Sequence, residues 1–327
     1  MLTYIVRRVL AMIPTLFLVS VLTFIIIQLP PGDFLTSLQA NAADSGGSID
    51  QAALDALRIQ YGLDQPMWVQ YVNWVKGFPS GDFGYSFEWK KPVSDLIGSR
   101  LGFTLVLSGL ALLFTWLVAI PIGIYSATHQ YSWQDLGLTT LGFLGLSIPD
   151  FMLGLIYLFV GVFVFNAPVG GLNSPDLESA PWSIPKVLDL ANHLLWPTII
   201  LGAAGTAQLI RIMRGNLLET LNEQFVTTAR AKGLPERTVV NKYAVRVAIN
   251  PLISVMGMHL PNLISGATIL GIVLSLPTTG PLFLHALINQ DIYLAGTFLL
   301  MLSALLMLGN LFADVLLAWA DPRIRYT

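Results

Sequence analysis

The chain has 327 residues, of which 54 % are hydrophobic and only 11 % carry a charge, and its formal net charge is −2. A soluble domain needs roughly twice that charged fraction to cover its surface, so the composition excludes an ordinary soluble protein and indicates a polytopic membrane protein. No excess of basic residues is present to bind nucleic acid. The chain contains no cysteine, which excludes disulfides, thiolate metal sites and cysteine nucleophiles.

Six apolar stretches predict an all-α protein with six transmembrane helices, because a helix needs about 20 mostly apolar residues to cross a bilayer. The stretches are residues 9–29, 101–128, 136–167, 194–210, 248–276 and 292–320. The first is longer than the apolar region of about 7–15 residues in a signal peptide, and no cleavage site of small residues follows it. We therefore expect it to remain as a membrane anchor.

The distribution of Lys and Arg predicts the orientation, because cytoplasmic loops carry an excess of these residues. With the N-terminus inside, eleven of the 17 basic residues lie in the cytoplasm, seven of them in the connection 211–247. Most of the others lie in the long connection 30–100. We therefore expect both termini in the cytoplasm.

Two connections are too long to be simple turns. Residues 30–100 contain ten aromatic side chains, which predict a small packed cap on the external side. Residues 211–247 are basic and lie on the cytoplasmic side. The expected organisation is an N-terminal anchor (1–29), an external cap (30–100) and a core of five transmembrane helices (101–327) that includes the loop 211–247.

Catalytic and metal-binding motifs are missing from the sequence. No H-E-x-x-H motif occurs, and the four histidines never fall at ligand spacing. No lysine follows a glycine, which excludes a Walker A phosphate loop, and no G-x-S-x-G serine motif is present. We therefore expect no catalytic residue, metal site or cofactor on this chain.

The cytoplasmic segment 224–237 carries the most informative pattern. It contains no helix breaker before Gly233, which suits the left-handed position after a helix, and Pro235 suits the first turn of a second helix. Two short helices joined by a turn are expected, with Ala229 and Ala231 keeping the surface flat for a partner. On the residues alone, a lever for a partner protein and a basic loop that only fixes topology are equally supported.

This segment resembles the "EAA" loop of binding-protein-dependent ABC importers, in detail that of the dipeptide/oligopeptide/nickel permease family. The resemblance extends over the whole chain. Residues 1–31 are similar to the family's N-terminal anchor, residues 61–66 and 81–86 to its external signature, and residues 321–326 to its ending. Two departures are visible: Thr227 or Thr228 stands where the family has an acidic residue, and residues 274–281 lack the usual aromatic-Pro-Gly segment.

The resemblance implies a permease subunit in the bacterial inner membrane, with the permease fold. Its implied partners are a homologous permease, two cytoplasmic ATPases that hold ATP and Mg, and an external solute-binding protein. The residues implied to couple to the ATPase are Phe225, Thr227, Thr228, Ala229, Arg230, Ala231, Lys232, Gly233 and Leu234. A short peptide is the expected substrate, and an oligosaccharide, an opine or a nickel complex is the alternative within the family.

Polar residues inside the fifth stretch are candidates for a translocation path. Their spacings of 4, 4 and 3 place them on one helix face, and they are Ser254, Met258, Asn262 and Ser265. Hydrogen bonding to neighbouring helices is the alternative role. His259 lies off this face and is expected to pack in the interior.

Asp150 is a carboxylate inside an apolar stretch, which is a functional hypothesis by default because its burial is costly. It is expected either to bind a substrate amine in a water-filled cavity or to cap a helix that restarts after Pro149. Asp314, near the cytoplasmic interface, is expected to be structural. Close helix packing is expected at four small residues, Gly142, Gly145, Gly154 and Gly161.

Two other classes of protein are alternatives. A secondary transporter needs inverted repeats and paired ionisable groups within the membrane, and neither is evident. A membrane enzyme needs a nucleophile, a base or a metal set, and none is found.

Overall fold

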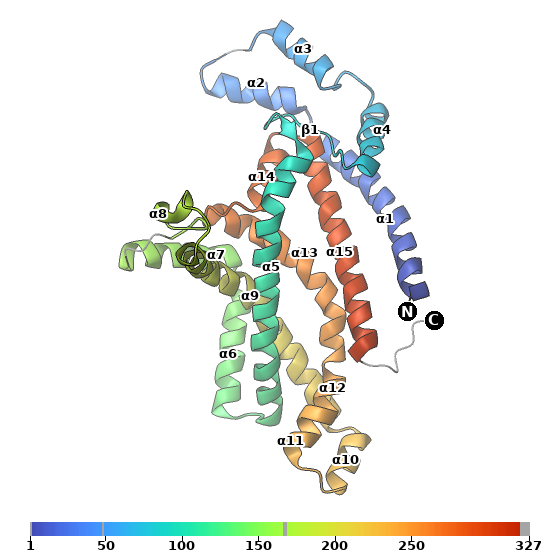
Figure 1. Ribbon diagram of the computed structural model, residues 1–327, viewed down its shortest axis with the longest axis vertical. Helices are drawn as coiled ribbons and strands as arrows, with labels where there is room; N and C mark the ends of the chain where they lie inside the picture. Colours follow the sequence, from blue (N-terminus) through green and yellow to red (C-terminus); the bar gives the residue numbers. More distant parts are fainter. Residues whose placement is uncertain (1, 48, 166–168, 321–327) are drawn as a thin grey trace. The chain divides into compact units, whose positions relative to one another are not determined.

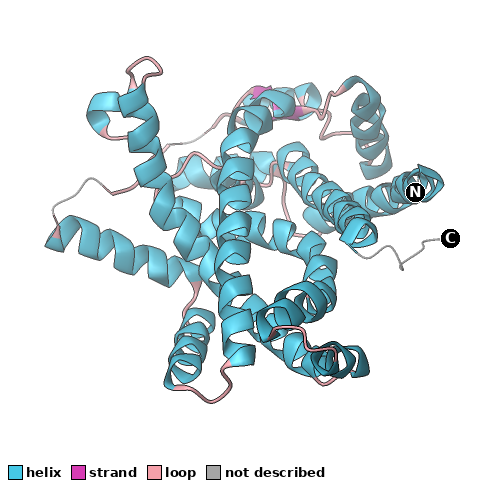
Figure 2. Cartoon of the chain, turned by 60° about the horizontal axis from the view of Figure 1, so that its bottom comes forward, coloured by secondary structure: helices cyan, strands magenta, loops and turns pink. Residues whose placement is uncertain are grey.

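Helices dominate the computed structural model, which describes residues 2–47, 49–165 and 169–320 (Figure 1). Among these residues the strands are limited to β1 (Tyr85–Ser86) and β2 (Lys91–Pro92), which pair in antiparallel fashion (Figure 2). The expected all-α fold class is confirmed.

Four helices are long and apolar enough to cross a membrane, namely α1 (Leu2–Gln28), α5 (Val93–Thr128), α9 (Ile184–Leu221) and α15 (Ile292–Ala320). Two further spans are bent. After α6 (Trp133–Ser147) the chain turns by 96° into the segment Asp150–Val164, and α13 (Asn250–Val273) bends by 46° between its two parts. With each bent pair counted as one span, the number of spans agrees with the six expected.

The third expected stretch is a broken helix. Pro149 has no backbone N–H and disfavours helical backbone at Ile148, which lies at φ −99° and ψ 121°. Helix α6 therefore ends at Ser147, and a new helix, α7 (Asp150–Phe159), begins at Asp150. Ala167, the expected end of this stretch, and the tail 321–326 lie outside the described residues.

The fourth span is much longer than the expected residues 194–210. It corresponds to α9, which begins after Ser183 with Pro185 in its first turn, where a missing N–H leaves no hydrogen bond unmade. The shorter helices are α2 (Phe34–Asp44), α3 (Gln51–Gln60), α4 (Met67–Gly77), η1 (Phe78–Ser80), η2 (Val160–Val164), α8 (Pro175–Glu178), α10 (Gln224–Ala231), α11 (Glu236–Thr238), η3 (Val239–Ala244), α12 (Val245–Ala248) and α14 (Thr279–Ile288).

The chain divides into two compact units that do not follow the order of the sequence. The first unit comprises residues 1–8, 104–277 and 305–327, and the second comprises residues 9–103 and 278–304. Three helices, α1, α5 and α15, therefore contribute to both units. The consecutive segments 1–29, 30–100 and 101–327 remain a sequence-based prediction.

In the first unit, helices approach each other closely where a glycine leaves room. A Cβ on Gly257 of α13 would lie only 2.6 Å from the Cα of Asn310 on α15. On α9, a Cβ on Gly202 would lie 2.8 Å from the ring of Phe114, and Thr115 donates a hydrogen bond of 3.1 Å to the Gly202 carbonyl. Small residues at these crossings allow the backbones to pack tightly, as is common in membrane proteins.

The four glycines expected to allow close packing differ in how much space a Cβ would have. A Cβ on Gly154 would lie 2.6 Å from the Leu270 side chain, and one on Gly161 would be more crowded still. At Gly142 and Gly145 the nearest atoms would be 3.7 and 3.6 Å away, which is ordinary contact. Close helix packing is therefore confirmed at Gly154, whereas the crowding at Gly161 comes from Val169, which lies in a loop.

The second unit has an aromatic core. Trp74 is 3 % exposed, stacks on Phe24 with 5.6 Å between ring centroids, and donates its indole N–H to the Phe83 carbonyl at 3.0 Å. A Cβ on Gly296 would lie 2.9 Å from the Trp74 ring. Several aromatic residues of the connection 30–100 are thus packed as predicted, whereas Trp68, Tyr85 and Trp89 are exposed.

Asp291, directly before α15, is completely buried in the second unit. It accepts hydrogen bonds from Ser86 Oγ at 2.5 Å, from the Leu294 N–H at 3.3 Å and from the Glu88 N–H at 3.4 Å. Burial raises the pKa of its carboxyl group, although these hydrogen bonds act in the opposite direction. Asp291 therefore joins the loop around β1 to the start of α15.

Candidate functional site

Residues 224–237, which we call the elbow, form two short helices joined by a turn. α10 ends before Lys232, Gly233 takes the left-handed value φ +76°, and α11 begins after Pro235. The arrangement predicted from Gly233 and Pro235 is confirmed. A Cβ on Gly233 would have no neighbour within 4 Å, so the requirement for glycine comes from the backbone conformation alone.

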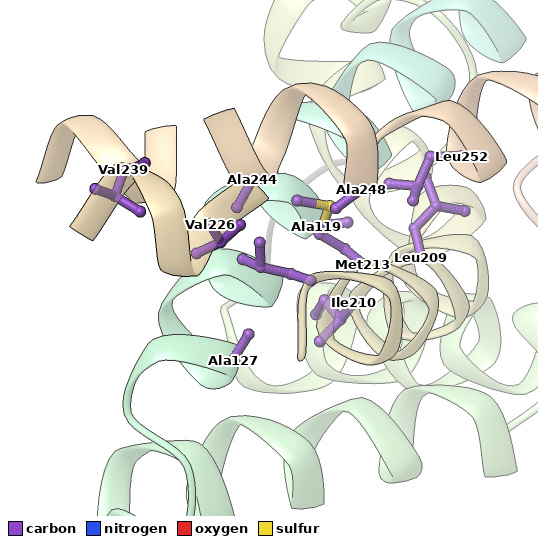
Figure 3. Close-up of a cluster of buried hydrophobic side chains, with 12 residues drawn as sticks. Ala119, Ala127, Leu209, Ile210, Met213, Val226, Val239, Ala244, Ala248 and Leu252 are labelled. Carbon is purple, nitrogen blue, oxygen red and sulfur yellow. The ribbon is translucent and has the colours of Figure 1, made fainter. Parts of the chain in front are cut away.

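The inner side of α10 belongs to the hydrophobic core of the first unit. Val226 is fully buried and Ala229 is 5 % exposed. They pack in a cluster with side chains of α9, η3 and α12. Figure 3 shows this cluster and labels Val226 together with Met213 and Ala244. Close packing of this kind resists deformation, so we expect α10 to move together with these helices.

The outer side of the elbow is open. Phe225 is 40 % exposed. The other exposed residues among those implied to contact an ATPase are Thr227, Thr228, Arg230, Ala231, Lys232 and Gly233. Leu234 is half-buried and packs against the cluster beneath α10.

Ala229 requires a correction. Its side chain lies in the chain's own core and does not share a flat outer surface with Ala231. The residues are two apart on a helix, where successive side chains are about 100° apart, so they point in very different directions. Only Ala231 keeps the role of a small residue on the exposed side.

An ion pair links the two arms of the elbow. Arg230 donates hydrogen bonds from Nη2 and Nε to the two carboxylate oxygens of Glu236, at 2.6 and 3.1 Å. The hydrogen bond from Arg230 lowers the pKa of the Glu236 carboxyl group. Both side chains are exposed, so the pair orients the turn more than it stabilises the fold.

The polar candidates of α13 lie on one exposed side of that helix, as their spacing predicts. Ser254, Met258, Asn262 and Ser265 are all exposed. His259, expected to lie off this face, is 9 % exposed. Whether the exposed face lines a translocation path stays a prediction.

Asp150 lies beside this polar face. It is the first residue of α7, and a Cβ on Gly266, the neighbour of Ser265, would lie 3.3 Å from its Oδ2. The N-cap position of α7 is Pro149, whose side chain cannot cap the helix, and within the described part of the chain Asp150 forms no ion pair. Asp150 is half-buried, and whether it binds a substrate amine or has a structural role at the start of α7 stays a prediction.

Sequence reasoning missed a buried ion pair between α6 and α9. Asp135 is 2 % exposed and accepts hydrogen bonds from Arg214 Nη2 at 3.0 Å and Nε at 3.2 Å. The sole hint in the sequence is an acidic residue three positions after Ser132, a pattern typical of a helix start. Nothing in the sequence indicates the partner, which is 79 positions away.

Asp314 has structural partners in the first unit. It accepts a hydrogen bond from the Tyr4 hydroxyl at 2.7 Å and pairs with Arg8 at 2.9 Å. These contacts agree with the structural role expected for it. They connect the beginning of α1 to α15.

Clusters of metal-ligating side chains do not occur among the described residues, where no three His, Asp or Glu side chains converge. The nearest arrangements are pairs. His193 Nδ1 lies 3.4 Å from Asp189 Oδ1, and His285 Nδ1 lies 3.9 Å from Glu88 Oε1.

Two family models together match nearly the whole chain. Residues 119–326, which hold the elbow, Asp150 and the polar face of α13, match the binding-protein-dependent transport system inner membrane component. Residues 1–108 match the N-terminal region of membrane components of these systems. The chain belongs to this family.

Individual members of the binding-protein-dependent transport family are similar over the full length of both chains. The oligopeptide transport system permease protein AppB of Bacillus subtilis is 36 % identical over 328 residues, with 100 % of each chain covered. A putative peptide permease protein of Brucella ovis is 35 % identical, and the glutathione transport system permease protein GsiC of Escherichia coli is 32 % identical, again with 100 % of each chain covered.

Membership of the binding-protein-dependent transport family makes this chain an inner-membrane component of an ABC transport system that depends on a solute-binding protein. Proteins of this family are permeases, and the ATPase activity normally resides on partner subunits. The resemblance read from the sequence is thereby confirmed.

Proposed function

We propose that this chain is one of two homologous permease subunits of an importer for short peptides and that it forms half of the translocation path. The relatives named for oligopeptides, peptides and glutathione support a peptide over an oligosaccharide, an opine or a nickel complex. The proposed partners are a second permease, two ATPases that bind ATP and Mg, and an external solute-binding protein. Both termini lie in the cytoplasm.

The two-sided structure of the elbow carries this proposal. Its exposed side offers Phe225, Ala231 and Lys232 to a partner, while Val226 and Ala229 are fixed among buried side chains of α9 and α12. A force applied to the outer side therefore moves these helices instead of bending the elbow. Packed helices have discrete arrangements, so such a push is suited to switching a pore between two states.

Asp150 and the exposed face of α13 provide the chemistry for a peptide. The amino terminus of a peptide is a cation, which the half-buried carboxylate of Asp150 attracts. Asn262 and Ser265 supply hydrogen-bond donors and acceptors to the peptide groups of a substrate, which lose hydrogen bonds to water inside the path. A carboxylate in a membrane span costs several kcal/mol unless it is paired or hydrated, which suits a water-filled path.

The elbow is tested by placing the same charge on two exposed alanines. Ala231→Asp should reduce retention of the ATPases on the purified complex and reduce the ATPase stimulation that loaded binding protein produces. Ala56→Asp, on the exposed side of α3, is the matched control and should do neither. Normal ATPase retention and normal peptide uptake by Ala231→Asp in proteoliposomes would show that the elbow is only a topological loop.

The orientation is tested with single cysteines, because the chain has no native cysteine. A thiol reagent that cannot cross membranes should label Ser80→Cys in intact cells and should not label Asn222→Cys. The opposite pattern would overturn the proposed orientation.

ATP is proposed to bind to the partner subunits only. The purified chain should therefore show no saturable binding of a fluorescent ATP analogue at micromolar concentration and no ATP hydrolysis. Saturable binding by the isolated chain would contradict this part of the proposal.

A further inference from the structure

The second unit contains an apolar groove with a volume of about 620 Å³. Its walls come from residues 13–20 of α1, 94–101 of α5 and 297–304 of α15. Three side chains of the connection 30–100 complete the lining, namely Val75, Phe78 and Phe83. The groove is thus built mainly from three helices that are long enough to span a membrane.

The depth of the groove matches one leaflet of a bilayer. Each of the three helices contributes seven steps of 1.5 Å, or about 10 Å, to a hydrocarbon leaflet of about 15 Å. The segments 94–101 and 297–304 follow shortly after the starts of α5 at Val93 and of α15 at Ile292. The segments 13–20 and 297–304 lie inside the expected spans 9–29 and 292–320, and the segment 94–101 ends where the expected span 101–128 begins. We therefore expect the groove to reach into the leaflet on the side of the connection 30–100, where lipid tails surround a membrane protein.

A polar depression of about 470 Å³ adjoins the groove, and the two share Ser94. Phe83 faces the groove, whereas its neighbours Asp82 and Gly84 line the depression together with Ser80 and Tyr85. No basic residue lines this depression. An apolar groove thus adjoins a patch that carries a carboxylate and several hydroxyl groups.

We propose that the groove binds an acyl chain of a phospholipid and that the polar depression holds its ammonium headgroup, as in phosphatidylethanolamine. At this depth the alternative to protein contact is lipid, so a tail fills the groove more readily than water does. The carboxylate of Asp82 attracts an ammonium group and repels an anionic headgroup. The N–H donors of ethanolamine match the oxygen atoms of Asp82, Ser94 and Tyr85. This site is independent of the proposed transport function.

The tail site is tested by filling the groove. A Cβ on Gly98, which lines the groove, would meet no atom within 4 Å, so Gly98→Leu adds bulk there without a clash. Gly102, one turn further along α5, is equally uncrowded and does not line the groove, so Gly102→Leu is the matched control. Retention of dioleoylphosphatidylethanolamine by the delipidated full chain is measured by native mass spectrometry.

Gly98→Leu should weaken this retention about tenfold, the ratio expected when roughly two methylene groups are no longer buried, and Gly102→Leu should leave it unchanged. Equal retention by the wild type and Gly98→Leu would overturn the proposal. Equal loss in both variants would also overturn it. If Gly98→Leu instead blocks purification of a second permease and leaves lipid retention unchanged, the groove is a protein interface and the proposal is wrong.

The headgroup site is tested by removing one charge. Asp82 accepts a hydrogen bond from the Gly84 N–H at 2.9 Å, which Asp82→Asn preserves. The wild type should retain phosphatidylethanolamine in preference to phosphatidylglycerol, and Asp82→Asn should abolish that preference. Asp64 is exposed and lies outside the depression, so Asp64→Asn is the control and should keep the preference for phosphatidylethanolamine. Equal retention of both lipids by the wild type, or an unchanged preference in Asp82→Asn, would contradict the headgroup assignment.

Discussion

The junction before α15 and the junction between α6 and α7 each place an acidic residue beside a helix start, with opposite surroundings. Asp291 is fully buried and accepts hydrogen bonds from Ser86, Glu88 and Leu294. Asp150 is only half-buried and has no salt-bridge partner in the described part of the chain. The first carboxylate helps to hold the fold, and the second is the one that we propose to bind substrate.

The elbow shows the same contrast within one short helix. Ala229 is enclosed by the chain, and Ala231 is open to a partner. A residue type or a position on a helix therefore says little about function until its neighbours are known. Variants of the closed positions should affect stability, and variants of the open positions should affect transport.

The largest loss of stability is expected for Asp291→Ala. Its removal leaves three donors without their acceptor, at a cost of about 1–3 kcal/mol for each that stays buried. The apparent melting temperature of the purified protein should fall by many degrees, and a protease should cut the loop around β1 faster. Asp44→Ala, an exposed acidic residue of α2, is the control and should melt like the wild type.

The pH dependence of Asp291 sharpens this prediction. Because burial raises its pKa in the folded protein above the ordinary value of 3.8, the folded protein binds this proton more tightly than the unfolded chain does. The contribution of Asp291 to stability is therefore greatest at low pH and declines as pH rises above about 4 through the raised pKa. The melting temperature of the wild type should therefore fall as pH rises through this range, and that of Asp291→Asn, which cannot lose a proton, should fall less. An identical fall in both proteins would contradict a raised pKa of Asp291.

Ala229→Asp is expected to be the next most damaging change. It puts an unpaired charge into the cluster that contains Val226 and Met213, where burial of a charge is strongly unfavourable. Limited proteolysis should cut within the elbow, whereas Ala231→Asp should leave the elbow intact. Equal protease resistance of the two variants would show that the division of α10 into closed and open sides is wrong.

Gly233→Val should have an intermediate effect. A β-branched residue at φ +76° adds strain of about 1–3 kcal/mol, even though its side chain would have free space. The variant should insert into the membrane normally and show reduced stimulation of the ATPase. Gly215→Val, at an uncrowded helical position in α9, is the control. Wild-type stimulation by Gly233→Val would mean that the direction of α11 is unimportant.

Asp150→Asn should leave stability almost unchanged and alter transport alone. The substitution keeps the size of the side chain and removes its charge, so uptake of peptides with a free amino terminus should fall several-fold. N-acetylated peptides that the wild type still transports should be affected much less. If Asp150→Asn lowered the melting temperature as much as Asp291→Ala does, Asp150 would also be needed for stability, and the proposed difference between the two carboxylates would be wrong.

Local signals explain what could be predicted from the sequence. Apolar length predicts the spans, Gly233 and Pro235 predict the elbow, and a spacing of 4, 4 and 3 places four residues on one side of α13. Each of these depends on neighbours within a few positions. The residues 292–320 expected for the last span coincide with α15 for the same reason.

Long-range partners explain what could not be predicted. Ala229 faces inward because of the cluster formed with α9 and α12, and the sequence of α10 does not contain that information. Asp135 and Arg214 meet across 79 positions, and Asp291 meets Ser86 across 205. Such pairs are determined by how distant helices pack, so a carboxylate that holds the fold and one that is free look alike in the sequence.

The second unit is made of two separate segments of the chain, and these are synthesised at different times. Residues 9–103 leave the ribosome early, but residues 278–304, which complete the same compact unit, follow only after the 174 residues from 104 to 277. At roughly 5–20 residues per second, this delay lasts about 9–35 s. During that time Ser86 has no Asp291 to bind and Trp74 has no Gly296 to pack against. The early segment therefore cannot complete its packing, and the side of Trp74 that contacts Gly296 stays uncovered, until α15 has been synthesised.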